Sequence, residues 1–71
     1  MEELLYEAIG ARIKEIRVDN KLSQSQFGKM LFVSQDTVSL WERGKSLPNT
    51  EYLIKIAKHF NVSADYILCL E

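Results

Sequence analysis

The 71-residue chain is poor in residues that form disulfides, bind metals or cross membranes. It has one cysteine, Cys69, and one histidine, His59, so it can form no internal disulfide and offers no cysteine and histidine set for zinc. No apolar run approaches the roughly 18 residues that a transmembrane helix needs. These shortages argue against a disulfide scaffold, a zinc finger and a membrane protein. A lone thiol fits the reducing cytoplasm, where we expect this protein to be found.

The length limits the chain to one domain. A chain this short buries only about 60% of its unfolded surface, so we expect residues 1–71 to share one modest core. Apolar residues make up 46% of the chain and charged residues 27%, which is typical of a soluble globular domain. The sequence shows no nucleophile beside a base and no phosphate-binding glycine loop. We therefore expect no enzyme and no cofactor.

The net charge of −1 hides an uneven distribution. Residues 12–45 contain seven basic and four acidic residues, which gives +3, whereas the remaining residues sum to −4. A basic face opposite an acidic one can orient a protein on a polyanion. A solvated surface of mixed charge explains the same numbers, so charge alone does not distinguish a polyanion-binding face from an ordinary surface.

Apolar residues recur at spacings of three and four along the whole chain, and no window alternates apolar and polar residues as a strand would. The sequence therefore predicts an all-α fold. The expected helices span 3–19, 24–31, 35–43, 50–60 and 64–70.

The first predicted helix has a clear apolar stripe. Leu5, Ile9, Ile13 and Ile16 follow one another at steps of four, four and three, and we expect all of them to be buried. Gly10 interrupts the helix at a cost of about 1 kcal/mol relative to alanine. It either permits close packing or marks the junction with an amino-terminal extension.

The later helices have strong start signals. Ser23, Ser34 and Ser63 are each preceded by an apolar residue and followed by another at the position where the two can pack together. Asn49 is expected to cap the fourth helix, and Asn61 is expected to end it in a left-handed conformation. The second and third helices are too short to bury much surface alone. They must pack on each other, which predicts a helix-turn-helix at about 23–43.

Four segments carry a family resemblance. They are Leu22-Ser-Gln-Ser-Gln-Phe, Val33-Ser-Gln-Asp-Thr-Val-Ser-Leu-Trp-Glu-Arg-Gly-Lys, Leu47-Pro and Ile56-Ala. Over residues 9–68 the chain resembles the lambda-repressor-like, Cro-type helix-turn-helix domains of the xenobiotic-response-element family. The resemblance implies a compact five-helix fold and sequence-specific binding of double-stranded DNA. It also implies a transcriptional regulator that binds a palindromic operator as a homodimer. The regulator is expected to be a repressor.

The third predicted helix is expected to read DNA. An α-helix fits the major groove, and the first exposed side chains of the second helix of the pair can reach base edges. Because Val38 and Trp41 face inward, the residues expected to contact bases are Gln35, Asp36, Ser39 and Leu40. Gln35 could form a bidentate pair with adenine, worth ~1–3 kcal/mol of discrimination. Asp36 could accept from cytosine N4, and Leu40 could pack on a thymine methyl group.

A second group of residues is expected to contact phosphates. The group consists of Gln24, Arg43, Lys45, Ser46, Arg12 and Lys14. The resemblance places Gln24 at a phosphate, and a helix amino terminus presents free amides to an anion in any case. By the same resemblance, Arg17 pairs with Glu42 and ties the first helix to the third.

Dimerisation and two departures from the family leave alternatives open. The last helix offers Tyr66, Cys69 and Leu70 as a possible dimer interface. Phe32 stands where the family usually has glycine, which predicts either a reshaped turn or a ring that fills a pocket. Leu40 replaces a polar or basic residue, and the pI is about 5.8. The alternative function is a protein-interaction module, such as an antitoxin-like or anti-repressor domain, and the chain is either an intact small regulator or part of a longer repressor.

Overall fold

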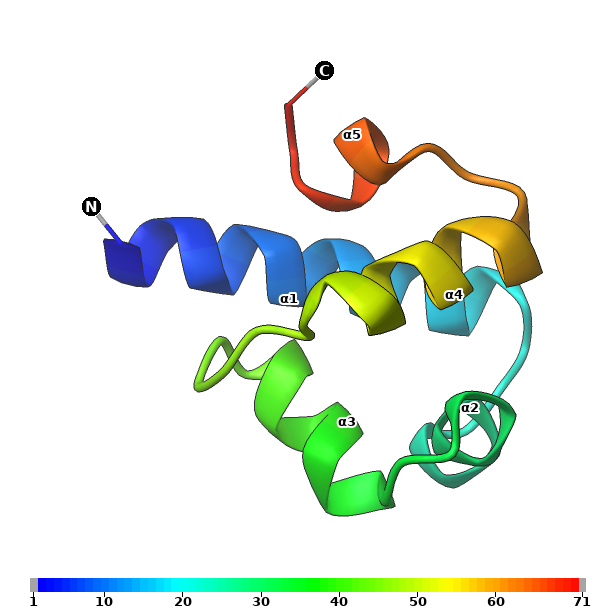
Figure 1. The fold of residues 1–71 in the computed structure, drawn as a ribbon. Coiled ribbons are helices and arrows are strands. Elements are labelled where there is room, and N and C mark those ends of the chain that lie inside the picture. Colours follow the sequence, from blue (N-terminus) through cyan, green and yellow to red (C-terminus); the bar gives the residue numbers. More distant parts are fainter. Residues whose placement is uncertain (1, 71) are drawn as a thin grey trace.

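The computed structural model describes residues 2–70, which form helices and connections without a β-strand. The helices are α1 (Glu2–Asp19), α2 (Gln24–Leu31), α3 (Gln35–Glu42), α4 (Thr50–Phe60) and α5 (Ala64–Ile67). Figure 1 shows α1 running through the middle of the molecule, with α5 on one side of it and the α2 and α3 pair on the other. The all-α, five-helix prediction is confirmed for this part of the chain.

Side-chain caps fix where the helices start. The Ser23 hydroxyl accepts from the Gln26 amide, and the Gln26 side chain accepts from the Ser23 amide, which completes a capping box. The side chains of Ser34, Asn49 and Ser63 each accept from the backbone amide three residues later. Each cap satisfies a donor that the first helical turn leaves free. As a result α2, α3, α4 and α5 all begin at the predicted residues.

The prediction was less accurate for two helix ends. Helix α5 ends at Ile67 rather than Leu70, because Cys69 adopts a left-handed conformation with φ of 60° and the Leu70 amide turns back to the Asp65 carbonyl at 2.8 Å. Helix α3 ends at Glu42, one residue earlier than predicted. Asn61 ends α4 in the expected left-handed conformation, with φ of 54°.

One apolar core joins all five helices. Its buried members are Ile9, Ile13, Ile16, Phe27, Leu31, Val38, Trp41, Ile56 and Ile67. Leu5 was expected among them but is 47% exposed, so that prediction was wrong. The amino-terminal turns of α1 extend past the other helices (Figure 1), which accounts for the exposure of a residue near the start of α1.

Gly10 allows α1 to pack closely on the end of α3. A β-carbon at residue 10 would lie 2.3 Å from the carbonyl oxygen of Trp41 and 2.9 Å from that of Glu42. Both distances are well below van der Waals contact. The sequence left two readings of Gly10 open, and the structure supports close packing.

Candidate nucleic-acid interface

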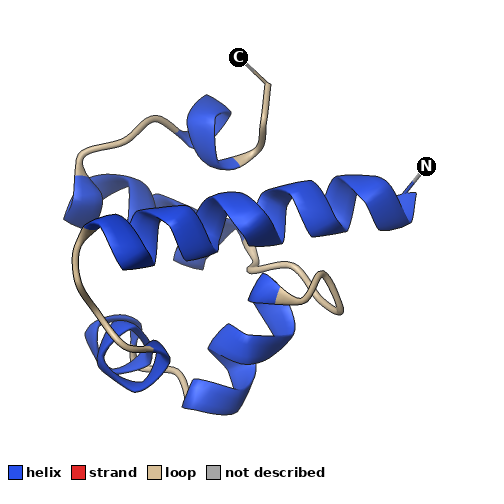
Figure 2. Ribbon diagram, turned by 180° about the vertical axis from the view of Figure 1, so that it is seen from behind, coloured by secondary structure: helices blue, strands red, loops and turns tan. Residues whose placement is uncertain are grey.

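Helices α2 and α3 form a helix-turn-helix unit below α1 (Figure 2). Phe27 and Leu31 of α2 and Val38 and Trp41 of α3 are buried between this unit and the other helices. Since these residues occupy the inner side of each helix, the opposite side of α3 is left free of packing. This free side is the surface that α3 can offer to DNA.

The side chains predicted to contact bases lie mostly on the free side of α3. Gln35 and Asp36, in its first turn, are exposed, and Leu40 is 39% exposed. Ser39 is half-buried, and its hydroxyl accepts a hydrogen bond from Nε of Arg43 at 3.1 Å. Gln35, Asp36 and Leu40 are therefore accessible to a ligand, and Ser39 is held by a basic side chain. Contact of these four with bases stays a prediction.

Basic side chains gather near the carboxyl end of α3. Arg43 directly follows the helix and is exposed, as is Lys45 in the connection to α4, where Ser46 is half-buried. Lys14 is exposed on α1, between Gly10 and Arg17 on the side of α1 that meets α3. These positions suit contacts with phosphates that border a groove occupied by α3.

Arg12 does not belong to this surface, which corrects the sequence prediction. Its Nη1 donates to the carbonyl of Tyr66 at 2.6 Å, and its guanidinium carbon lies 4.1 Å from the centroid of the Tyr66 ring. Tyr66 is part of α5, across α1 from α3 (Figure 1). Two residues of helix turn Arg12 by about 200° from Lys14, so the two side chains cannot serve the same face.

An ion pair joins α1 to α3, as the family resemblance implied. Arg17 donates to both carboxylate oxygens of Glu42, with 2.6 Å from Nε to Oε2 and 3.1 Å from Nη2 to Oε1. The two side chains are only 13% and 5% exposed. The hydrogen bond to Glu42 raises the pKa of Arg17 above its ordinary value. A third bond from Arg17, to the Leu22 carbonyl at 2.8 Å, adds the segment before α2 to the same network.

Gln24 also belongs to this network, which sequence reasoning did not find. Its Nε2 donates to Oε1 of Glu42 at 3.1 Å. Nε2 carries two hydrogens, so one N–H remains for another acceptor, and the backbone amide in the first turn of α2 is also free to donate. Gln24 therefore keeps donors for a phosphate. The bond to Glu42 spans 18 residues, and no local pattern could have shown it.

Phe32 contradicts both sequence expectations. The turn is not reshaped, since Phe32 has the left-handed angles φ 61° and ψ 39° at the end of α2. The ring fills no pocket either, because the residue is 86% exposed. The neighbouring charge is Lys55 of α4, whose Nζ lies 5.7 Å from the ring centroid.

The residues predicted for a dimer interface differ in their exposure. Tyr66 and Cys69 are half-buried against α1, where the Tyr66 hydroxyl donates to Glu15 and the Cys69 Sγ lies 3.6 Å from the Ala8 carbonyl. Leu70 is 68% exposed. Two further leucines that sequence reasoning did not propose are exposed one turn before Ala8, Leu4 at 67% and Leu5 at 47%.

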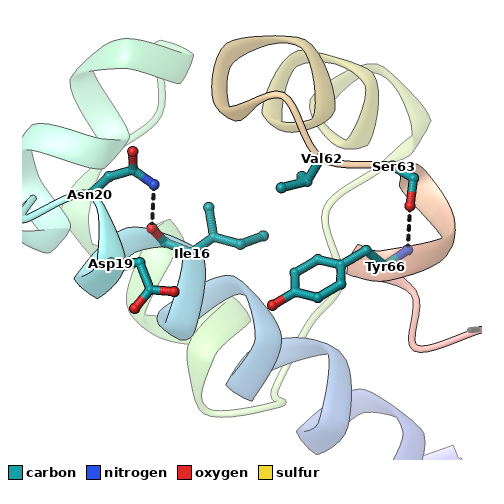
Figure 3. A pocket seen from close by; sticks show the side chains of 6 residues that line it. All are labelled: Ile16, Asp19, Asn20, Val62, Ser63 and Tyr66. Atoms are coloured by element: carbon teal, nitrogen blue, oxygen red, sulfur yellow. Dashed lines mark hydrogen bonds between the residues drawn. The ribbon is translucent and has the colours of Figure 1, made fainter.

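A small open pocket lies between α1 and the segment that leads into α5. Its volume is about 270 Å³, and its lining is formed by Ile16, Asp19, Asn20, Val62, Ser63 and Tyr66 (Figure 3). Within the described residues no helix has the length and apolar character to span a bilayer, and no three acidic, histidine or cysteine side chains are grouped as metal ligands. The pocket and the free side of α3 are on different parts of the molecule, so the pocket does not add to the surface of α3.

The chain belongs to the helix-turn-helix family, whose pattern matches residues 13–67. It is 39% identical over 57 residues to the transcriptional activator BcrR of Enterococcus faecalis, covering 80% of this chain and 28% of that protein. It is 40% identical over 60 residues to repressor protein C2 of Salmonella phage P22, covering 84% of this chain and 28% of the repressor.

A crystal structure of the P22 c2 repressor in complex with a synthetic operator is similar to this fold. The TM-score is 0.77 at 39% sequence identity, and the match covers 83% of this chain and 89% of the repressor chain in that structure. The present chain spans less than a third of the full length of the two curated relatives above.

Proposed function

We propose that this chain is a sequence-specific, double-stranded DNA-binding unit of transcriptional regulation and that α3 enters the major groove. The observation that carries this proposal is the exposed polar face of α3, which has basic side chains next to its carboxyl end. The matching repressor of phage P22 has been solved on an operator, which supports the same use of this fold. We infer that the outcome is repression. A unit that binds DNA at a promoter occupies that promoter, and it needs no further activity to do so.

We assign two kinds of contact to this interface. Base edges are read by Gln35, Asp36, Ser39 and Leu40. Phosphates are held by Gln24, Arg43, Lys45, Ser46 and Lys14. The first group carries sequence information, whereas the second fixes position and orientation.

We also infer that the protein acts as a homodimer on a palindromic operator in the cytoplasm. Two copies related by a twofold axis would place their α3 helices in successive major grooves, about 34 Å apart. Leu70 is 68% exposed and follows α5, which lies across α1 from α3 (Figure 1), so this leucine is available to a second copy while DNA is bound.

The test is selection of binding sites from a random duplex library, followed by titration of the selected site. Gln35→Ala should relax the preference at one base position of each half-site and weaken binding by ~1–3 kcal/mol, without changing the salt dependence. Arg43→Ala should weaken binding evenly across sequences and lower the salt slope by about 1. His59→Ala, at an exposed position late in α4, serves as the control and should bind as the wild type does.

The alternative is a protein-interaction module that has kept the fold. Failure of a demonstrably folded protein to enrich any duplex would contradict the DNA proposal. A partner interface built on Leu40 would then be insensitive to salt, in contrast to phosphate contacts, which weaken steeply as salt rises.

A further inference from the structure

Phe32 has a conformation and an exposure that folding alone does not explain. It occupies the left-handed region directly after α2, where glycine is favoured because a side chain there is strained. The ring gains little from burial, since the residue is 86% exposed. A strained residue that makes few packing contacts points to a function outside the folded chain.

The surroundings of the ring are cationic. Nζ of Lys55 lies 5.7 Å from the Phe32 ring and 5.3 Å from the Tyr52 ring. Lys29 is exposed three residues before Phe32, in the last turn of α2. The carboxylate nearest to Lys55 is that of Glu51 at 3.3 Å, and this side chain is 69% exposed, so another anion can replace it. An apolar ring beside the ammonium group of Lys55 suits a surface of sugars and phosphates.

The position of Phe32 also suits the DNA backbone. The residue lies two positions before Ser34, the cap of α3. If the amino-terminal end of α3 lies in the major groove, the turn that leads into it lies at the rim of the groove, where the sugar-phosphate backbone runs. The outward residues of α3, Asp36 and Leu40, come later in the chain, and in the proposed complex they face the bases. Phe32 therefore lies beyond the base pairs that α3 reads.

We propose that Phe32 and Lys55 form an additional DNA contact at the outer edge of each half-site. The ring packs on a deoxyribose of a flanking nucleotide, and the ammonium group of Lys55 binds the adjacent phosphate. The contact touches no base edge, so it adds affinity without sequence preference. This inference rests on the proposed function, because it requires α3 to lie in the groove.

Two duplexes of equal length test the contact. Both carry the selected site, and one has neutral methylphosphonates in place of the phosphates that flank each half-site. Phe32→Gly should raise the melting temperature of the protein because strain is relieved, and should weaken binding to the natural duplex roughly three- to fivefold, the scale of one exposed cation and aromatic contact. Lys55→Gln should lower the salt slope by about 1. On the neutral-flank duplex, wild type and Lys55→Gln should bind equally.

The control is Ile54→Ala, which removes a neighbouring apolar side chain that is 49% exposed and should leave binding to both duplexes unchanged. If the wild type binds DNA and neither Phe32→Gly nor Lys55→Gln binds it more weakly, the proposed contact is overturned and the proposed function stands. Phe32 would then be part of a surface for a protein. An equal loss by Lys55→Gln on both duplexes would also overturn it, because the effect would not come from the flanking phosphates. Absence of binding by folded wild type would instead overturn the proposed function itself.

Discussion

At residue 10, the absence of a side chain determines how closely α1 approaches α3. An alanine β-carbon there would meet the Trp41 carbonyl oxygen at 2.3 Å, and a backbone atom cannot rotate away as a side chain can. Alanine normally stabilises a helix by about 1 kcal/mol relative to glycine. We expect Gly10→Ala to do the opposite and to destabilise the protein by about 1–3 kcal/mol, as overpacking does, measured by urea denaturation.

The control for this prediction uses the next residue of the same helix. Ala11 is exposed, so Ala11→Gly should lower stability only by the helix propensity difference of about 1 kcal/mol. A Gly10→Ala variant more stable than the wild type would contradict this prediction. It would show that α1 and α3 can move apart without loss of stability.

Left-handed residues show what can be predicted from the sequence at this scale. Glycine and asparagine tolerate positive φ, and the end of α4 at Asn61 was anticipated for that reason. Lys21, Phe32 and Cys69 adopt the same conformation, each just past the end of a helix. Their side chains have no special preference for it. The packing of the chain around each of them determines it, so the early end of α5 at Ile67 could not be predicted.

Between elements, the partly buried ion pair of Arg17 and Glu42 is the main polar link of α1 to α3. Removal of one partner leaves a charge in a site that is only 5–13% exposed. We expect Arg17→Ala to lower the free energy of unfolding by ~3–5 kcal/mol, measured by chemical denaturation. The loss should exceed that of an exposed contact because Glu42 would keep only the bond from Gln24.

The matched comparison is the exposed pair of Glu51 and Lys55 on α4, at 3.3 Å. Glu51→Ala should change stability by less than about 0.5 kcal/mol, since exposed pairs four residues apart contribute little. Replacement of Arg17 and Glu42 together by apolar residues should destabilise less than Arg17→Ala alone. Equal effects of Arg17→Ala and Glu51→Ala would contradict the structural importance of the Arg17 and Glu42 pair.

The helix starts and the outward residues of α3 were predictable because both depend on local chemistry. Serine caps gave the first residues of α2, α3 and α5, and the inward spacing of Val38 and Trp41 identified the free side of α3. The predictions failed where an element distant in the sequence determines the exposure or the partner of a side chain.

Two residues of α1 illustrate these failures. Leu5 is exposed because the helix extends past its neighbours, and Arg12 is occupied by Tyr66 because α5 lies on that side of α1. The periodicity of α1 identifies its faces, but it does not say which neighbour covers each of them.

At the scale of the described molecule, several charged side chains are unevenly placed about α1. The side of α3 carries Arg43 and Lys45, whereas the opposite side, next to α5, carries Glu15 and Asp19 near Tyr66. A net charge of −1 is therefore compatible with DNA binding, since a polyanion attracts one side and repels the other. The acidic side would face away from DNA, where a second protein chain can approach it.

The same separation makes the carboxyl-terminal leucine a test of dimerisation. Leu70 is 68% exposed, and the Cys69 thiol beside it lies 3.6 Å from the Ala8 carbonyl, so Leu70 and the exposed Leu4 belong to the same end of the molecule. We expect Leu70→Glu to leave the melting temperature nearly unchanged and to weaken binding to a palindromic duplex by about 100-fold or more, because the avidity of two linked sites is lost. Binding to a single half-site should stay unchanged, and sedimentation should show monomers. His59→Glu, which adds the same charge at an exposed position late in α4, is the control and should leave palindrome binding unchanged. Unaltered palindrome binding by Leu70→Glu would place the dimer contact elsewhere.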